Sequence, residues 1–148
     1  MLKVDAKSYS ELTKEELYEL LHLRSEIFVV EQDCVYQDID YKDQKALHII
    51  GKVTGEIVAY TRIFKPGDYF KNPSIGRVLV KMNYRKYGYG HDIIKVSVEV
   101  IHKQYASFPI EISAQTYLKK FYETHGFTQQ GEGYLEDGIP HIKMIKFH

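Results

Sequence analysis

The alternation of apolar and polar residues along the chain predicts a mixed order of strands and helices. Runs rich in β-branched and aromatic residues indicate strands, and apolar residues three or four positions apart indicate helices. The predicted strands cover residues 2–8, 47–53, 56–64, 75–81, 108–114, 127–136 and 139–147. The predicted helices cover residues 13–30, 90–104 and 117–125. The predicted order of elements is therefore β, α, β–β, β, α, β, α, β–β, with no internal repeat or linker.

Two dipeptides mark tight hairpin turns between predicted strands. Thr54-Gly55 separates the runs in the middle of the chain, and Asp137-Gly138 separates the last two runs. Both place glycine where a two-residue turn needs the left-handed conformation, which glycine adopts without a steric penalty. We therefore expect two antiparallel hairpins, one near the middle of the chain and one at its C-terminal end.

The run at 75–81 is apolar on both faces, which is typical of a central strand covered on both sides. The crossover from this strand through the helix at 90–104 to the strand at 108–114 predicts a parallel, right-handed pair. In sheets of this kind, ligands bind beyond the carboxyl ends of the parallel strands. The polar segment 85–91 lies at that end, so we expect it to border a ligand site.

The segment 85–91 combines two cations with two glycines directly before a helix. Arg85 and Lys86 add positive charge, while Gly88 and Gly90 let the backbone approach a ligand closely. A helix N-terminus also presents unpaired N–H groups and about half a positive charge. This arrangement favours an anionic group such as a diphosphate, although the same glycine spacing occurs in ordinary strand-to-helix turns. The third glycine of a dinucleotide fingerprint and the Gly-Lys-Ser/Thr of a P-loop are missing.

Composition narrows the classes of function. The 148 residues contain 20 Lys plus Arg and 20 Asp plus Glu, so the net charge gives no sign of nucleic-acid binding. The N-terminal segment has no uninterrupted apolar stretch, and no later segment is long enough to span a bilayer. We therefore expect a cytoplasmic protein without a membrane partner. Cys34 is the only cysteine, which excludes an internal disulfide and gives no support to a cysteine-based zinc site. We interpret it as a packed hydrophobic residue rather than a nucleophile.

Charged residues in two places allow alternative interpretations. The segment 31–43 carries five acidic groups and one lysine. It is either a solvated loop or a negative rim that attracts a cationic amine. Arg62 and Arg77 lie inside β-rich runs predicted to face one another. They either bind a substrate carboxylate or pair inside the fold with Glu31 or Glu111.

The motif Arg85-x-x-Gly88-x-Gly90, between a strand and a helix, resembles the acyl-CoA pyrophosphate loop of the GNAT superfamily of N-acetyltransferases. The resemblance implies a single GNAT-like domain over residues 1–148 with an α/β (α+β) fold. Its sheet is mixed and mostly antiparallel, with a parallel pair at strands 4 and 5 that diverge, and with helices on both faces. The resemblance also implies acetyl-CoA as co-substrate, bound by Val78, Leu79, Val80, Arg85, Lys86, Tyr87, Gly88, Tyr89, Gly90, His91 and Gln115.

The segment from Phe121 to Phe127, FYETHGF, is similar to the superfamily's Leu/Phe-Tyr-x-x-x-Gly-Phe. The similarity implies that Tyr122 protonates the departing thiolate. A phenol with an ordinary pKa of about 10 suits donation to a thiolate whose acid has a pKa near 8.5. Without the resemblance, Tyr122 is one of 13 tyrosines, and its place on a helix face favours core packing. Gln115 stands where many GNAT members carry a coenzyme-binding Asn.

The sequence does not single out a general base. Glu31 and His141 are catalytic candidates, and His48 is a third. Each of these residue types is more often structural. In particular, a lone histidine on an apolar strand, such as His48, is typical of a hydrogen-bonded core residue.

Further residues resemble the ElaA-type group of the GNAT superfamily, from about residue 24 to the C-terminal end. The matching positions are 28–32, Cys34, Tyr36, Asp40, Asp43, His48, 75–78, Ala114, Gln115, Phe121, Tyr122 and 136–141. ElaA-type proteins usually carry Glu near position 38, where this chain has Asp38, a departure that leaves the charge unchanged.

The leading hypothesis is an acetyl-CoA-dependent N-acetyltransferase that transfers the acetyl group directly to a primary amine, without a metal. One alternative is a CoA-binding sensor or interaction module without catalysis, and another is a binder of a different nucleotide that shares only the loop geometry. The acceptor is left open among a small metabolite amine, a polyamine, a peptide N-terminus and a protein lysine. A homodimer formed through the C-terminal hairpin at 127–147 is also left open.

Overall fold

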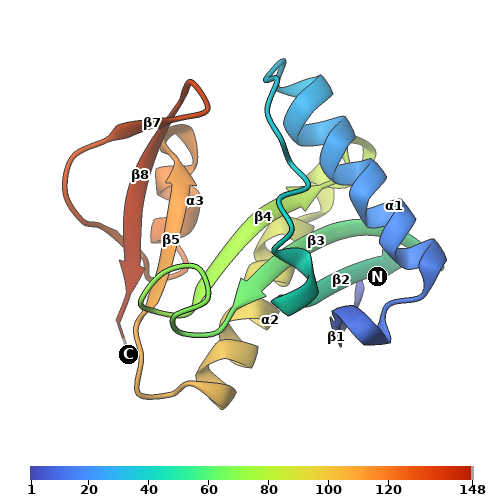
Figure 1. The fold of residues 1–148 in the computed structure, drawn as a ribbon, viewed down its shortest axis with the longest axis horizontal. Helices are drawn as coiled ribbons and strands as arrows, with labels where there is room; N and C mark the ends of the chain where they lie inside the picture. The colour runs from blue at the N-terminus through green and yellow to red at the C-terminus, as the bar shows by residue number, and fades with distance from the viewer. Residues whose placement is uncertain (148) are drawn as a thin grey trace.

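The computed structural model describes residues 1–147, which form a mixed sheet of eight strands (Figure 1). The strand order is β1-β2-β3-β4-β5-β8-β6, and β7 pairs with β8. The strands are β1 (Lys3–Ser8), β2 (Leu47–Val53), β3 (Glu56–Phe64), β4 (Ser74–Val80), β5 (Ile110–Gln115), β6 (Thr128–Gln129), β7 (Tyr134–Glu136) and β8 (Ile139–Lys146). Only β4 and β5 pair in parallel among these described strands. The expected mixed sheet with one parallel pair at strands 4 and 5 is confirmed.

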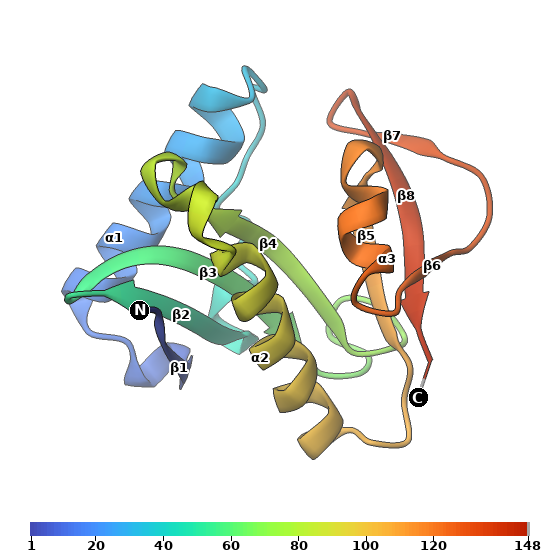
Figure 2. The same cartoon turned by 180° about the vertical axis from the view of Figure 1, so that it is seen from behind.

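Helices cover both faces of this sheet, as expected. The helix α1 (Lys14–Arg24) lies on one face, while α2 (Tyr89–Gln104) and α3 (Lys119–Glu123) lie on the other (Figures 1 and 2). Short helical turns complete the chain: η1 (Tyr9–Glu11), η2 (Ser25–Glu31), η3 (Asp43–Lys45), η4 (Met82–Tyr87) and η5 (Thr116–Leu118).

The first helix departs from the prediction in its second half. The α-helix ends at Arg24, and the predicted remainder up to residue 30 is a π-helix, η2, instead. Hydrogen bonds between residues five apart mark these wider turns, such as the 3.0 Å bond from the Cys34 N–H to the Val29 carbonyl. Ile27 and Phe28 both lie buried within η2. Periodicity alone did not separate the two helix types, because both repeat after about four residues.

The parallel pair of strands separates almost at once. Ser74 and Glu111 are the only paired residues between β4 and β5 within the described chain, and the Glu111 N–H donates to the Pro73 carbonyl at 2.9 Å. Figures 1 and 2 show the two strands side by side at this end and apart at the other. The backbone of β4 beyond this pair is therefore bonded to β3 on one side only. The opening between the strands is where the candidate site lies.

A bulge in β4 lies beside this opening. Gly76 pairs with Arg62 of β3, but the next paired residue of β4 is Leu79, opposite Tyr60, so the register shifts between them. Arg77 lies in the bulge with φ of 51°, a left-handed conformation that is uncommon for a residue with a side chain.

The two predicted hairpin turns are confirmed. In both, the two turn residues have positive φ: 47° and 84° at Thr54-Gly55, and 50° and 78° at Asp137-Gly138. The predicted strand over 127–136 is wrong in its middle, because only β6 and β7 within it pair with β8. Gly131 between them has φ of 81°, which takes the backbone out of the extended conformation.

Two hydrophobic clusters pack against the two faces of the sheet. One joins α2 to residues from both sides of the opening, including Ile63 of β3, Ile112 of β5 and Met144 of β8. The other joins α1 and η2 to β2, β3 and β4 through residues such as Leu20 and Tyr60. No helix within residues 1–147 is long and apolar enough to cross a membrane.

Candidate active site between the diverging strands

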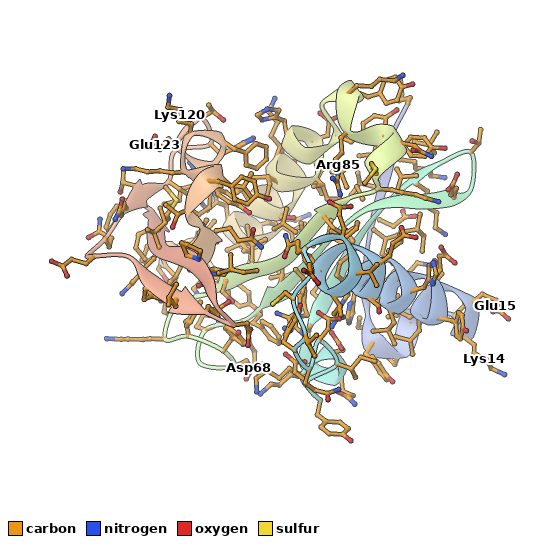
Figure 3. All side chains as sticks on the ribbon, turned by 90° about the horizontal axis from the view of Figure 1, so that it is seen from above. Lys14, Glu15, Asp68, Arg85, Lys120 and Glu123 are labelled. Carbon is orange, nitrogen blue, oxygen red and sulfur yellow. The ribbon has the colours of Figure 1, made fainter. Side chains whose placement is uncertain are left out.

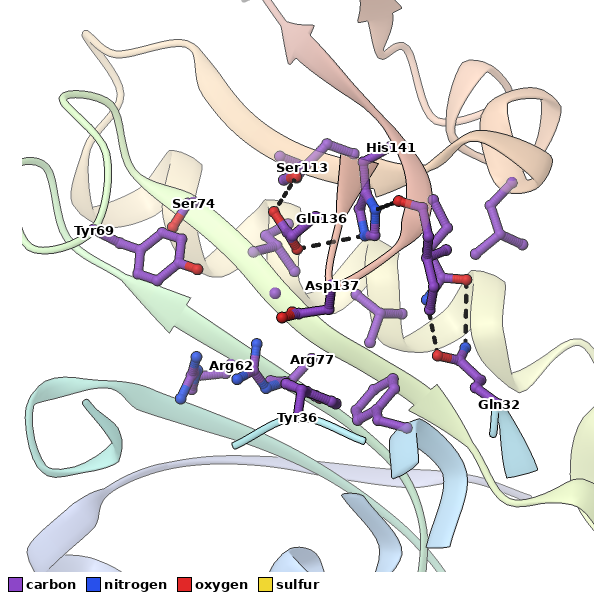
Figure 4. Close-up of a pocket in the computed structure, with 18 of the residues that line it drawn as sticks. Gln32, Tyr36, Arg62, Tyr69, Ser74, Arg77, Ser113, Glu136, Asp137 and His141 are labelled. Carbon is purple, nitrogen blue, oxygen red and sulfur yellow. Dashed lines mark hydrogen bonds and ion pairs between the residues drawn. The ribbon is translucent and has the colours of Figure 1, made fainter. Parts of the chain in front are cut away.

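A cavity of about 420 Å³ lies where β4 and β5 diverge (Figure 4). Its size is within the range of small-molecule sites. Five parts of the chain line it: η2 and the segment after it, the strands β3 and β4 with their connecting loop, the end of β5, the turn η5 with α3, and the β7–β8 hairpin. Lining residues that carry polar groups include Gln32, Cys34, Tyr36, Arg62, Tyr69, Ser74, Arg77, Ser113, Gln115, Tyr122, Glu136, Asp137 and His141.

The predicted phosphate loop lies next to this opening, before α2. It is not an open loop, because η4 includes Arg85, Lys86 and Tyr87. Gly88 then turns the chain with φ of 75° and serves as the N-cap of α2 without any side-chain hydrogen bond. Open space surrounds Gly88, since nothing lies within 4 Å of where its Cβ would be. The first N–H groups of the helix have no partner within it and no N-cap side chain bonds them, which suits an anion.

Arg85 and Glu31 pair with one another rather than facing the cavity. Arg85 donates from Nη1 and Nη2 to the two carboxylate oxygens of Glu31 at 2.8 and 3.0 Å. It also donates from Nε to the Val80 carbonyl at 2.8 Å. Figure 3 shows Arg85 between the start of α2 and the neighbouring helical segment. Because Glu31 neutralises Arg85 in this ion pair, Arg85 contributes less positive potential at the N-terminus of α2 than the sequence suggested.

The remaining residues of the predicted coenzyme set lie around the opening. Val78 and Gln115 line the cavity, while Leu79 is buried beneath α1. Gln115 and Gln32 exchange two hydrogen bonds, at 3.2 and 3.3 Å, across the gap between η2 and β5. His91, in the first turn of α2, lies with Nδ1 2.8 Å from Nε2 of His125.

Tyr122 lies on α3 with its side chain against the cavity. Only 5% of the residue is exposed, and its ring contacts Phe121 and Phe127 edge-on with centroids 5.1 and 5.9 Å away. Its hydroxyl makes no hydrogen bond with any residue of the described chain. Burial raises the pKa of the Tyr122 phenol above its ordinary value, so the hydroxyl keeps its proton at neutral pH.

Glu136 and His141 form a pair of acceptors on the β7–β8 hairpin. Nδ1 of His141 lies 2.7 Å from the Ile139 carbonyl oxygen, which can only accept, so Nδ1 carries the proton. In the neutral ring, Nε2 then has a lone pair, and it lies 3.4 Å from a carboxylate oxygen of Glu136. Two acceptors this close together create a favourable position for one proton donor placed beside both of them.

Hydrogen bonds from β5 fix the carboxylate of Glu136. The Ser113 hydroxyl donates to the second carboxylate oxygen at 3.0 Å. Since that proton is committed, the Tyr134 hydroxyl, 2.5 Å away, donates to the Ser113 oxygen. Burial raises the pKa of Tyr134, which keeps this donor protonated. The sequence analysis did not identify Ser113 and Glu136 as site residues. The two-residue turn was a usable signal for Glu136, because it fixes the register of the hairpin that carries Glu136, Tyr134 and His141.

The acidic segment is neither of the two alternatives proposed from the sequence. Asp38 and Asp43 are buried, and together with Asp40 they pair with three arginines, Arg24, Arg62 and Arg77, at distances of 2.7–3.5 Å. The expected partners of Arg62 and Arg77, which were Glu31 and Glu111, are wrong. Pattern analysis did not find these pairs because the partners lie 14–39 positions apart in the sequence.

The arginines hold the pKa values of these carboxyl groups down. Burial alone would raise the pKa of Asp40, but hydrogen bonds from Arg62 and its charge outweigh burial and lower it to about 2. The pKa of Asp43 is lowered in the same way, with Arg24 as its strongest partner. The segment therefore presents few free negative charges.

Two side chains interpreted as structural from the sequence make hydrogen bonds. His48 is fully buried between the Tyr60 hydroxyl and the Asp43 carbonyl, at 2.5 and 2.9 Å, and burial lowers its pKa. Cys34 is buried at the cavity wall, where its thiol donates to the Asp137 carbonyl at 3.3 Å. No group of three or more potential metal-ligating side chains occurs within residues 1–147.

Comparisons with known proteins agree with this geometry. The family model for the acetyltransferase (GNAT) domain matches residues 8–147. Protein ElaA of Escherichia coli is 41% identical over 93% of this chain and 92% of its own. A UPF0039 protein of Synechocystis is 38% identical over 93% of this chain and 90% of its own.

Solved structures give the same result. Crystal structures of E. coli ElaA and of an acyl-CoA N-acyltransferase from Pseudomonas aeruginosa each superpose with a TM-score of 0.93. Their sequence identities are 39% and 36%, and both alignments cover 99% of this chain and all of the other. The family match, the relatives and the divergence of strands 4 and 5 all agree. The chain belongs to the GNAT superfamily of N-acyltransferases, in its ElaA-type group.

Proposed function

We propose that this protein is an acetyl-CoA-dependent N-acetyltransferase that transfers the acetyl group directly to a primary amine. The observation that carries the proposal is that one cavity, between the diverging strands, joins a proton-bearing phenol to a pair of proton acceptors. Tyr122 provides the first, and Glu136 with His141 provides the second. An amine acyl transfer needs both, because the amine loses protons and the sulfur gains one.

The coenzyme fits the edge of the sheet and the start of α2. The free N–H groups after Gly88 suit the pyrophosphate, and Lys86 nearby adds a cation that no described carboxylate engages. The backbone of residues 78–80 has no strand partner on the side that faces β5, so it offers hydrogen bonds inside the opening. Acetyl-CoA supplies the activated thioester carbonyl.

The acceptor amine enters as an ammonium group and binds beside Nε2 of His141 and the carboxylate of Glu136, within hydrogen-bond reach of both. Both are acceptors, and Glu136 adds a negative charge. His141 takes one proton from the ammonium, since its Nε2 lone pair is free while Nδ1 is held by Ile139. Glu136 acts as a positioning residue that favours the resulting imidazolium. Glu31 has no part in this step, because it pairs with Arg85 away from the cavity.

Proton transfer to sulfur completes the reaction. The nitrogen–carbon bond forms and the carbon–sulfur bond breaks, while Tyr122 gives its proton to the departing sulfur. The nitrogen loses its second proton as the amide forms, and this proton restores the phenol. His141 releases the first proton to solvent. Because no nucleophilic side chain attacks the thioester, the transfer is direct.

The first test is calorimetric titration with acetyl-CoA, with CoA, ATP and NAD as comparators. We expect binding of acetyl-CoA and CoA alone. Equal binding of ATP or NAD would instead identify a general nucleotide binder, and no binding of acetyl-CoA would exclude the proposal.

The second test compares Tyr122→Phe with Tyr117→Phe. Tyr122→Phe keeps the ring that packs against Phe127 but removes the hydroxyl, so we expect kcat to fall about 100-fold to 10,000-fold with acetyl-CoA affinity nearly unchanged. Tyr117 is 74% exposed on η5, and its replacement controls for the loss of a phenol. An unchanged kcat in Tyr122→Phe would exclude this residue as the acid. Binding without turnover of any amine would identify a CoA-binding module.

A further inference from the structure

The cavity has two walls of opposite charge (Figure 4). Arg62 of β3 and Arg77 of β4 lie on one wall, while Glu136 and Asp137 of the β7–β8 hairpin lie on the other. Figure 4 shows the Asp137 carboxylate directed toward the arginine wall. No ion pair joins the two walls within the described chain, so the cavity separates the arginines from the carboxylates of the hairpin.

On the arginine wall, the guanidinium groups border the cavity and the carboxylates that pair with them do not. Both arginines line the cavity, but none of their carboxylate partners, Asp38, Asp40 and Asp43, does. The carboxylates therefore lie behind the guanidinium groups, and the positive end of each pair faces the cavity. A group of this kind is held rigidly by its partners and still attracts an anion in front of it.

Arg77 has a donor left for such an anion. Its Nε donates to the Asp38 carboxylate at 2.8 Å, and its Nη2 donates to the Asp38 carbonyl at 3.1 Å. Its Nη1 makes no hydrogen bond with any residue between 1 and 147. The left-handed bulge at Arg77 and the Tyr36 ring, 5.7 Å from the guanidinium carbon, fix the direction of the side chain. The donor is thus pre-organised rather than free to move away.

We infer that the acceptor is a small zwitterion of the amino-acid type, with its ammonium beside Glu136 and His141 and its carboxylate on Arg77. This inference rests on the proposed acetyl transfer and narrows its acceptor. Carboxylate and guanidinium groups match in shape and charge, and a cavity of about 420 Å³ has the size of a small-molecule site. A polyamine has cations at both ends, so one of them would meet the arginine wall.

The experiment measures free CoA released from acetyl-CoA with a panel of amines. The panel contains the standard α-amino acids, β-alanine and 4-aminobutyrate, and it contains the amides of the same acids. Spermidine, cadaverine and a lysine-containing peptide with blocked ends represent amines without a free carboxylate. We expect the highest kcat/KM for an amino acid, and a value about 10-fold to 100-fold lower for its amide, which keeps the shape but not the charge.

A variant links this preference to one residue. In Arg77→Gln, we expect the ratio of kcat/KM for the acid over its amide to fall to about 1. Lys81→Gln is the matched control, because it also removes an ion-paired cation at the end of β4, outside the cavity. A general loss of stability would lower both substrates equally and would not change the ratio.

The outcomes separate the inference from the proposed function. A preference for the acid over its amide supports the inference even if Arg77→Gln does not fold. Highest turnover with spermidine, cadaverine or the peptide would overturn the inference and leave the acetyltransferase proposal standing. Equal turnover of an acid and its amide would also overturn the inference and leave the acetyltransferase proposal standing. No turnover with any amine on the panel would overturn both.

Discussion

We expect the loss of the Arg24 side chain to lower the stability of this fold strongly. It is fully buried, and it donates to Asp38 at 2.9 Å, to Asp43 at 2.7 Å and to the Asp38 carbonyl at 3.1 Å. Replacement by Met keeps the length of the side chain but leaves two buried carboxylates with one arginine fewer. Each hydrogen bond to a charged group contributes about 1.5–3 kcal/mol. The two bonds to carboxylates therefore account for roughly 3–6 kcal/mol.

Removal of one partner from a buried ion pair costs about 3–5 kcal/mol in other proteins, which agrees with this range. We therefore expect Arg24→Met to lower the free energy of unfolding by about 4 kcal/mol, or roughly 1,000-fold in the equilibrium constant. In urea, with a slope near 2 kcal/mol/M, the midpoint should fall by about 2 M. Circular dichroism of the helices follows this transition.

Lys81→Met provides the control. Lys81 and Glu56 form an ion pair of 2.6 Å, shorter than the 2.7 Å pair of Arg24 and Asp43, but their side chains are 29% and 43% exposed. Exposed pairs contribute about 0–1 kcal/mol, because water screens them. If both variants lose the same stability, burial does not govern the strength of these pairs and the reasoning is wrong.

Three further predictions follow from single residues. The low pKa values of Asp40 and Asp43 give stability that is present above the unfolded pKa near 4 and is lost as the pH falls toward about 2. An acid titration followed by circular dichroism should therefore unfold the protein in that window. Gly88→Ala should lower the free energy of unfolding by about 1 kcal/mol, since φ is 75°, whereas Gly90→Ala should not, as thermal melts will show. Cys34→Ala should leave kcat within about 3-fold in the CoA-release assay, and complete loss would indicate a covalent step.

The sequence was sufficient for the elements whose signals are local. The turn at Asp137-Gly138 follows from two residues alone, because few other pairs accept positive φ twice. The helix α2 follows from its apolar spacing, which placed its start at residue 90, one residue after the observed start at Tyr89. The divergence of strands 4 and 5 came from the family resemblance and not from periodicity, which says nothing of how far apart two strands lie.

The parts that were missed depend on distant residues. Three arginines and three aspartates come into contact only when the chain folds. From the sequence, the acidic segment therefore looked either solvated or free to bind a cation. The carboxylate of Glu136 is placed by Ser113, which lies 23 positions away on a different strand. The π-helix at 25–31 differs from an α-helix by one residue in the spacing of its hydrogen bonds, and no residue type marks that difference.

The single residue pair that joins β4 to β5 has a consequence for how the molecule melts. Few backbone hydrogen bonds cross that junction, so β1–β4 and β5–β8 are hardly connected through their backbones. The hydrophobic cluster under α2 does cross it, because Ile63 and Ile75 on one side and Ile112 and Met144 on the other belong to the same packed core. Side-chain packing therefore couples the halves, and heating should produce one calorimetric peak, with equal calorimetric and van't Hoff enthalpies, rather than two.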